Sequence, residues 1–146
     1  MSIEVNKAIV TRFLEEINRG NLGIIDELVA ETFREIPLWY GAAQIPPGRS
    51  GVAQDMEQFF TALPDMQMTI NDLVAEGDRV VVRFTTRGTH TGPFRDVAPT
   101  GKTIQWAEIG IVQIADGQIV SFTTLWDQLG FLQQMGVVPG PESAGG

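Results

Sequence analysis

Glu108 stands in a stretch of sequence that otherwise has the pattern of an apolar strand face. Side chains alternate here, so that Trp106, Glu108, Gly110 and Val112 share one side of the predicted strand. Burial among apolar neighbours raises the pKa of a carboxyl group, which prepares it to donate or accept a proton. Glu108 is therefore a candidate catalytic acid or base. A shift of one residue in the strand would instead turn it to solvent.

His90 is the single histidine of the chain. With an unperturbed pKa of about 6.5, a histidine can exchange protons near neutral pH. The alternation of the preceding residues places His90 at the end of the inward face of a strand. Two roles remain open: a proton donor at the mouth of a cavity, or a structural histidine that hydrogen-bonds the loop Thr91–Gly101. A catalytic pair of His90 and Glu108 would span neighbouring strands.

Three other polar side chains are candidates for the same site. Asp127 lies at a predicted strand-to-helix junction, where a carboxylate commonly caps the helix; a catalytic role is the alternative. Tyr40, the only tyrosine, could donate a hydrogen bond to an oxyanion. Thr124 would place a hydroxyl group on the inward face of the last strand and contact a substrate.

Aromatic side chains accompany these polar groups. They would bind a flat or polycyclic hydrophobic ligand, or they would simply fill the core. The candidates for substrate binding are Trp39, Tyr40, Trp106, Phe122 and Trp126, together with Thr124.

The bulk composition excludes several kinds of protein. A chain of 146 residues with a net charge of −8 lacks the basic surface that nucleic acids and anionic membranes require. The absence of cysteine excludes disulfides and thiolate metal sites, and a single histidine excludes zinc sites with several imidazoles. The N-terminal sequence does not resemble a signal peptide, and no apolar run reaches about 18 residues. We expect a cytoplasmic protein without a metal.

The N-terminal half is predicted to be helical with one irregular interruption. Apolar residues at helical spacing predict a helix over Ile3–Arg19 and a short second helix over 22–29, capped by Asn21. The segment Phe33–Ser50 contains three prolines and two glycines besides Trp39 and Tyr40, and is interpreted as an irregular binding loop. A third helix is predicted from Ser50 to Pro64.

The C-terminal half is predicted to be a set of antiparallel strands. These span Met66–Ala75, Arg79–His90 and two strands between Lys102 and Trp126, joined by the turn Ala115-Asp116-Gly117. Val120, Phe122, Thr124 and Trp126 are expected to point inward from the last strand. A short helix over 127–136 follows.

Helices first and strands afterwards indicate an α+β fold. A strongly curved sheet wrapped around the helices would enclose the inward side chains as a cavity. We expect a single domain over residues 1–136 and a flexible tail over residues 137–146.

Three segments resemble the SnoaL-like polyketide cyclase family: FLEEINRGNLGIIDELV, GTHTGPFRDVAPTGKTI and DGQIVSFTTLWDQLGFLQQMG. The resemblance implies the cone-shaped α+β barrel of the nuclear transport factor 2-like superfamily, which ketosteroid isomerase and limonene epoxide hydrolase share. It also implies a deep apolar pocket and a homodimer formed through the sheet.

The resemblance places Thr124 where the cyclases carry an acid/base aspartate, three residues before Asp127. Ser121-Phe122-Thr123 stands at the family's common Glu-His-Trp, and Gly110 falls at the position of a cyclase histidine. His90 matches the histidine of the family's Gly-x-His-x-Gly turn. Because a threonine hydroxyl cannot replace a carboxylate as a general base, we expect the working acid at Glu108.

Together these observations predict a cofactor-independent acid/base enzyme for a hydrophobic, oxygenated small molecule of polyketide- or terpenoid-like class. Cyclisation, isomerisation and epoxide opening all fit, which leaves isomerase, lyase and hydrolase chemistry open. The alternative is a non-catalytic small-molecule-binding protein of the same fold. A third possibility is the cofactor-free oxygenation of an activated phenol.

Overall fold

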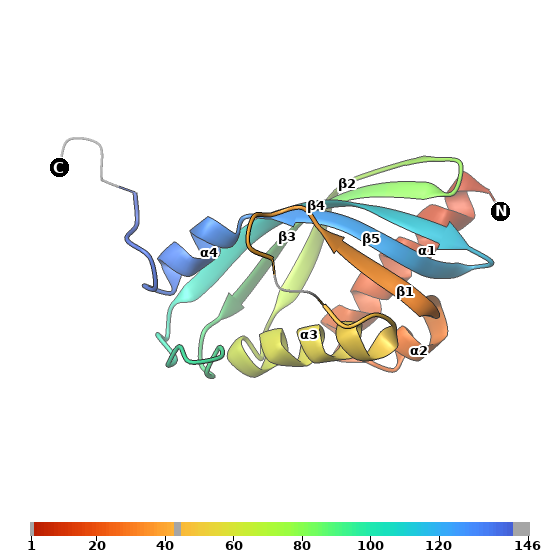
Figure 1. The fold of residues 1–146 in the computed structure, drawn as a ribbon. Coiled ribbons are helices and arrows are strands. Elements are labelled where there is room, and N and C mark those ends of the chain that lie inside the picture. The colour runs from red at the N-terminus through yellow and green to blue at the C-terminus, as the bar shows by residue number, and fades with distance from the viewer. Residues whose placement is uncertain (1, 43–44, 142–146) are drawn as a thin grey trace.

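The computed structural model describes residues 2–42 and 45–141, which form four helices and five strands (Figure 1). The helices are α1 (Ile3–Asn18), α2 (Ile24–Leu28), α3 (Arg49–Ala62) and α4 (Gln128–Gln134). The strands are β1 (Val29–Pro37), β2 (Gln67–Glu76), β3 (Arg79–Thr89), β4 (Thr103–Ala115) and β5 (Gln118–Trp126). The α+β class and the short C-terminal helix predicted from the sequence are confirmed.

Helix α1 begins where its sequence predicts. The Ser2 side chain accepts a hydrogen bond from the Val5 N–H and caps the first turn. Val10, Leu14 and Ile17 recur at three- and four-residue steps and are buried. This stripe faces the curved sheet, because α1 packs against β2 and β3.

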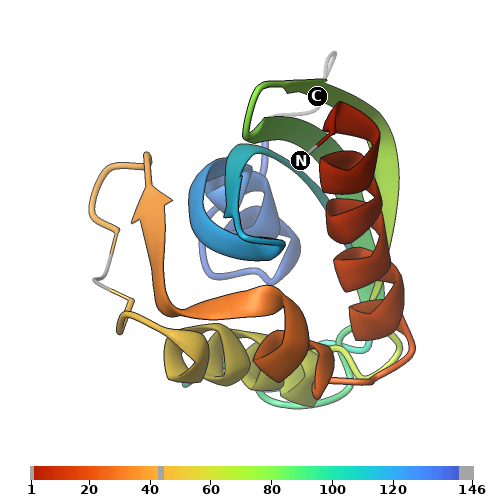
Figure 2. The same cartoon turned by 90° about the vertical axis from the view of Figure 1, so that its right-hand side faces the viewer.

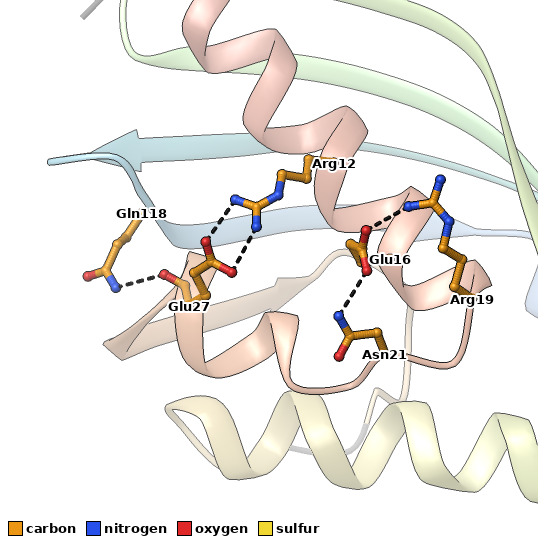
Figure 3. A network of polar contacts seen from close by, with 6 residues as sticks. All are labelled: Arg12, Glu16, Arg19, Asn21, Glu27 and Gln118. Carbon is orange, nitrogen blue, oxygen red and sulfur yellow. Dashed lines mark hydrogen bonds and ion pairs between the residues drawn. The ribbon is translucent and has the colours of Figure 1, made fainter.

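Exposed polar contacts join the first helices to the start of β5 (Figure 3). Arg12 forms an ion pair of 2.8 Å with Glu27 of α2, whose carbonyl oxygen accepts a hydrogen bond from Gln118. Asn21 donates to Glu16 at 2.8 Å. The predicted capping role of Asn21 was therefore wrong, since α2 begins two residues later than expected, at Ile24 after Gly23.

The five strands form one sheet in the order β1-β5-β4-β3-β2. Strands β2 to β5 pair antiparallel as predicted, whereas β1 runs parallel to β5. The sheet is therefore mixed, and the expectation of a purely antiparallel sheet was wrong. Part of Phe33–Ser50, predicted to be irregular, is strand. β1 starts directly at Val29, after α2, without the turn residues that usually mark a strand boundary.

The sheet curls strongly, and the helices close its concave side (Figure 2). Helices α1, α2 and α3 lie along this side, whereas α4 packs against β4 at the far end (Figure 1). An aliphatic cluster fills the end near α1 and α2, and an aromatic cluster fills the end near α4. The arrangement leaves an interior between them to which sheet and helices both contribute.

The hairpin between β4 and β5 has the predicted turn. Asp116 and Gly117 adopt φ values of 52° and 75°, the left-handed geometry that such two-residue turns require. Just beyond it, Ile114 pairs with Ile119 and Gln113 with Ser121, so Val120 is an extra residue in β5. This bulge turns Ile119, instead of Val120, toward the interior. The predicted inward placement of Val120 was wrong, because the extra residue changes which side chains of the strand face inward.

Helices of the described ranges 2–42 and 45–141 are all too short or too polar to cross a lipid bilayer. After α4, the Gln133 side chain donates to the Pro139 carbonyl oxygen at 3.0 Å. Of the tail predicted to be flexible, residues 142–146 lie outside the described residues.

Candidate active site

A cavity of about 280 Å³ lies between the concave face of the sheet and the helices. Most of its wall is apolar, and four charged side chains interrupt that wall. They come from separate parts of the chain: Glu35 from β1, Asp55 from α3, Arg95 from the loop between β3 and β4, and Glu108 from β4. The cavity is large enough for a substituted ring, since one of roughly 150 Å³ already holds benzene.

Glu108 faces the cavity, as its place in the alternation of β4 predicts. On the neighbouring strand, buried Thr124 donates a hydrogen bond of 2.6 Å to Glu108 Oε2. No hydrogen bond to Oε1 is formed within the described residues, so this atom is available to a ligand. Burial raises the pKa of Glu108 to about 7, the Thr124 hydrogen bond opposes the rise, and repulsion from Asp55 adds to it.

Two further carboxyl groups share the cavity and were not predicted. Burial, followed by repulsion from Asp55 and Glu108, raises the pKa of Glu35 to about 8. Burial also raises the pKa of Asp55 to about 6, while Arg95 acts in the opposite direction. The three acids are therefore close enough to influence one another's protonation.

A simple signal could have identified both acids. Glu35 lies two residues after Phe33 on β1, and both side chains line the cavity, as the period of a strand requires. Asp55 lies between Val52 and Phe59, at spacings of three and four residues, on the buried stripe of α3. In each case a carboxyl group interrupts an apolar face, the same signal that identified Glu108.

Aromatic rings form the wall near Glu108. Trp126 makes edge-to-face contacts with Trp39 at 6.1 Å and with Trp106 at 6.0 Å between ring centroids. Phe59 contacts Trp106 at 5.6 Å and Trp126 at 6.0 Å. All four rings line the cavity, and the steep angles between most of them form corners instead of a single stack.

Phe122 also lines the cavity, and Gly110 makes room for it. A Cβ atom at Gly110 would lie 2.2 Å from the Phe122 ring and 2.7 Å from the Thr123 carbonyl oxygen. The resemblance assigned a cyclase histidine to this position. In this chain the Phe122 ring takes that space, so a side chain at position 110 would have to displace the ring.

His90 lies outside the cavity. Its side chain is fully buried, and Nδ1 accepts a hydrogen bond of 3.2 Å from the Thr100 N–H and contacts the Thr100 hydroxyl at 3.0 Å. Burial lowers the pKa of His90, and its Nε2 has no partner within the described residues. Glu108 pairs with Phe84, six residues before His90, which corresponds to about 20 Å along the strand. The structure therefore does not bring the predicted pair together.

Asp127 and Tyr40 also lie outside the cavity wall. The Asp127 side chain caps α4 by accepting a hydrogen bond of 2.9 Å from the Gly130 N–H, the structural alternative considered for this residue. Tyr40 is fully exposed in the turn after β1, where Pro37 ends the strand. The expectation that Tyr40 would contact a substrate does not fit this position, because the chain turns outward after Trp39.

The described residues contain no group of three or more His, Cys, Asp or Glu side chains arranged to hold a metal ion. Glu35, Asp55 and Glu108 line one cavity, but they do not form such a group. The arrangement can instead exchange protons with an organic ligand, because each carboxyl group has a pKa near neutrality and faces an apolar space.

Solved structures with the same fold include candidate polyketide cyclases and a candidate hydroxylase. IdmH from Streptomyces antibioticus, a candidate polyketide cyclase, is 31% identical over 90% of this chain and 98% of its own, with a TM-score of 0.76. AclR from Streptomyces galilaeus, a candidate hydroxylase, is 25% identical over 97% of this chain and 87% of its own, with a TM-score of 0.85.

A SnoaL-like protein from Jannaschia sp. CCS1 is 23% identical over 95% of this chain and 98% of its own, with a TM-score of 0.82, and supports the fold alone. A search among curated protein sequences gives no match. The model of one family, SnoaL-like polyketide cyclase, matches residues 8–135, nearly the whole of the described chain. This chain therefore belongs to the SnoaL-like polyketide cyclase family.

Proposed function

We propose that this protein is a cofactor-independent acid/base enzyme for a hydrophobic, oxygenated small molecule of polyketide- or terpenoid-like class. The observation that carries the proposal is Glu108, a carboxyl group with a pKa near 7 that faces an apolar cavity and is oriented by Thr124. A base with a pKa near the working pH is well matched to proton transfer. Membership in a family of polyketide cyclases supports the same class of substrate.

The cavity suggests a division of roles during cyclisation or isomerisation. Ionised Glu108 would remove a proton from a carbon next to a carbonyl group, and the electron pair would move into an enolate. Protonated Glu35, whose pKa is about 8, would donate its proton to the oxygen on which negative charge develops. The species formed in this way is an enol. In cyclisation its carbon attacks a second carbonyl carbon of the substrate, the C=O π bond there breaks, its oxygen takes the proton from Glu108, and the enol O–H returns its proton to Glu35. In isomerisation Glu108 instead delivers its proton to another carbon of the same system, and Glu35 recovers its proton in the same way. Thr124 holds Glu108 in position, and the aromatic rings orient the substrate.

A second candidate function is the binding of a small molecule without turnover. It is favoured by Thr124, which occupies the position where the resemblance places the family's acid/base aspartate. A binding protein would quench its tryptophan fluorescence with a ligand, while mass spectrometry would detect no product. An enzyme would convert the same ligand.

The proposal can be tested without the natural substrate. 5-Nitrobenzisoxazole is a small aromatic molecule that a buried carboxylate opens by removing its ring C–H proton. The N–O bond breaks in the same step and releases a coloured nitrile phenolate. We expect Glu108→Gln to lower this rate at least 100-fold, because general-base catalysis contributes about 10²–10⁴. Glutamine keeps the size of the side chain and can still accept the hydrogen bond from Thr124.

Glu57→Gln is the matched control. Glu57 lies on α3, two residues after Asp55, but it is exposed and does not line the cavity. Its substitution removes the same charge and should leave the rate unchanged. Equal rates for the wild type and Glu108→Gln would exclude Glu108 as the base and favour the binding function.

A further inference from the structure

We propose that the ligand of this cavity carries a positively charged nitrogen, as a quaternary or protonated amine, within its hydrophobic frame. This inference rests on the proposed function, because it concerns the ligand of the same cavity. It is carried by the placement of Glu35, Asp55 and Glu108 around one apolar space that aromatic rings enclose.

When its acids are ionised, the cavity contains more negative than positive groups. Glu35, Asp55 and Glu108 enter from β1, α3 and β4, and within the described residues Arg95 is the only cation that lines the same space. Arg95 belongs to an exposed part of the β3–β4 loop, with its guanidinium 5.2 Å from the centre of the Phe94 ring, and its charge acts on Asp55. Glu35 and Glu108 have no cationic partner in the described part of the chain. A cation bound between them would relieve their mutual repulsion.

The geometry favours an organic cation over a metal ion. A metal needs several oxygen atoms within about 2–2.6 Å of one point. In residues 2–42 and 45–141, no set of three acids meets that condition. An alkylammonium group is larger, does not need direct coordination, and can lie among carboxylates at several ångströms.

The aromatic wall supports the same type of ligand. Trp39, Phe59, Trp106 and Trp126 meet at corners, with interplanar angles of 84° for Trp39–Trp126 and 62° for Trp106–Trp126. Rings that meet at steep angles can present more than one π surface to one group, and the π face of tryptophan is the strongest aromatic partner of a cation. A cation in this cavity would therefore lie in a space lined by both carboxylates and indole rings.

Two probes of equal shape isolate the contribution of charge. 4-(Trimethylammonio)benzyl alcohol and 4-tert-butylbenzyl alcohol differ only in a quaternary nitrogen in place of a carbon. Binding of each is measured by isothermal titration calorimetry at a pH of about 9, where all three acids are ionised because the highest of their pKa values is about 8. We expect the ammonium compound to bind at least ten times more tightly, although the neutral compound is the more hydrophobic.

The preference should depend on pH and on two named residues. As the pH falls from about 9 to about 5, the acids gain protons and the preference for the cation should disappear. Arg95 is the other charged group that lines the cavity. Glu35→Gln and Glu108→Gln should each lower the affinity for the ammonium compound several-fold. The affinity for the neutral alcohol should remain unchanged. Glu57→Gln is the control that should change neither affinity.

Three results would overturn the inference. They are equal or tighter binding of the neutral alcohol at high pH, a preference that both glutamine variants retain, or no detectable binding of either probe. Turnover of 5-nitrobenzisoxazole distinguishes this failure from that of the proposed function. If that reaction depends on Glu108 while the cation preference is absent, only the nature of the ligand is wrong. If the preference is present without turnover, the cavity binds cations but is not an acid/base site.

Discussion

Two regions of this molecule each join a buried titratable side chain to a threonine, but their surroundings differ. In the loop region after β3, His90 is hydrogen-bonded to Thr100; in the cavity wall, Glu108 is hydrogen-bonded to Thr124. In both regions burial favours the neutral form of the titratable group, because it lowers the pKa of His90 and raises the pKa of Glu108. His90 is enclosed by protein, whereas one oxygen of Glu108 faces an empty space large enough for a ligand. Burial alone therefore does not distinguish a catalytic candidate from a structural group; access to a cavity does.

The largest effect on stability is expected at His90. His90→Ala should lower the free energy of unfolding by about 2–4 kcal/mol, because it leaves a hole in the core and removes the partner of the Thr100 N–H. The turnover of 5-nitrobenzisoxazole per folded molecule should be unchanged. Urea denaturation and the rate assay, made on the same preparation, measure the two quantities.

The pH dependence gives a second check on His90. Because its pKa is lowered in the folded protein, the neutral ring contributes stability above the unfolded pKa of about 6.5, and this contribution is lost as the pH falls through the folded value. His90→Ala should lack this acid-induced loss. If His90→Ala kept its stability but lost turnover, His90 would be a catalytic residue and not a structural one.

The cavity acids should have the opposite effect on stability. Their folded pKa values lie above those of the unfolded chain, so between about pH 4.5 and pH 8 the folded state binds more protons and stability falls as the pH rises. Glu35→Gln and Glu108→Gln should therefore raise the free energy of unfolding at pH 8 by on the order of 2 kcal/mol each. At pH 4 they should have little effect. Thermal unfolding across this range measures the difference, and lower stability at pH 8 would contradict it.

The smallest effect is expected at Thr124. Its hydroxyl donates a hydrogen bond to Glu108, and this bond lowers the pKa of that group. Thr124→Val keeps the shape but removes the donor, so the midpoint of the pH–rate profile for 5-nitrobenzisoxazole should move upward by about half a pH unit to one unit. The rate well above the midpoint should remain close to that of the wild type. A profile that does not move would mean that Thr124 does not influence Glu108.

Much of the fold could be predicted from local patterns. The amphipathic stripe of α1 and the Asp116-Gly117 turn are local signals, and both were confirmed. Strand β1 was missed because its pairing with β5 is parallel and joins residues far apart in the sequence. The inward placement of Val120 was wrong for a related reason, since a bulge depends on the partner strand.

The candidate site was predictable only in part. Glu108 was found because strand alternation is local, and its contact with Thr124 follows from the pairing of β4 with β5. Glu35 was missed together with its strand, and Asp55 was missed because a carboxyl group on a helical stripe was not considered. The position of His90 could not be predicted, because the distance between His90 and Glu108 depends on the register of β3 and β4.

The parallel pairing of β1 with β5 has a consequence for how the protein folds during synthesis. Val29 of β1 pairs with Ile119, so the strand that carries Glu35 has no partner in the sheet until β5, about 90 residues later in the sequence, has also left the ribosome. Contacts between distant parts of a chain form slowly, because a long loop must close first. The acid-lined cavity is therefore among the last parts of the molecule to assemble. A chain that stops before β5 would expose β1 as an unpaired edge, which favours aggregation.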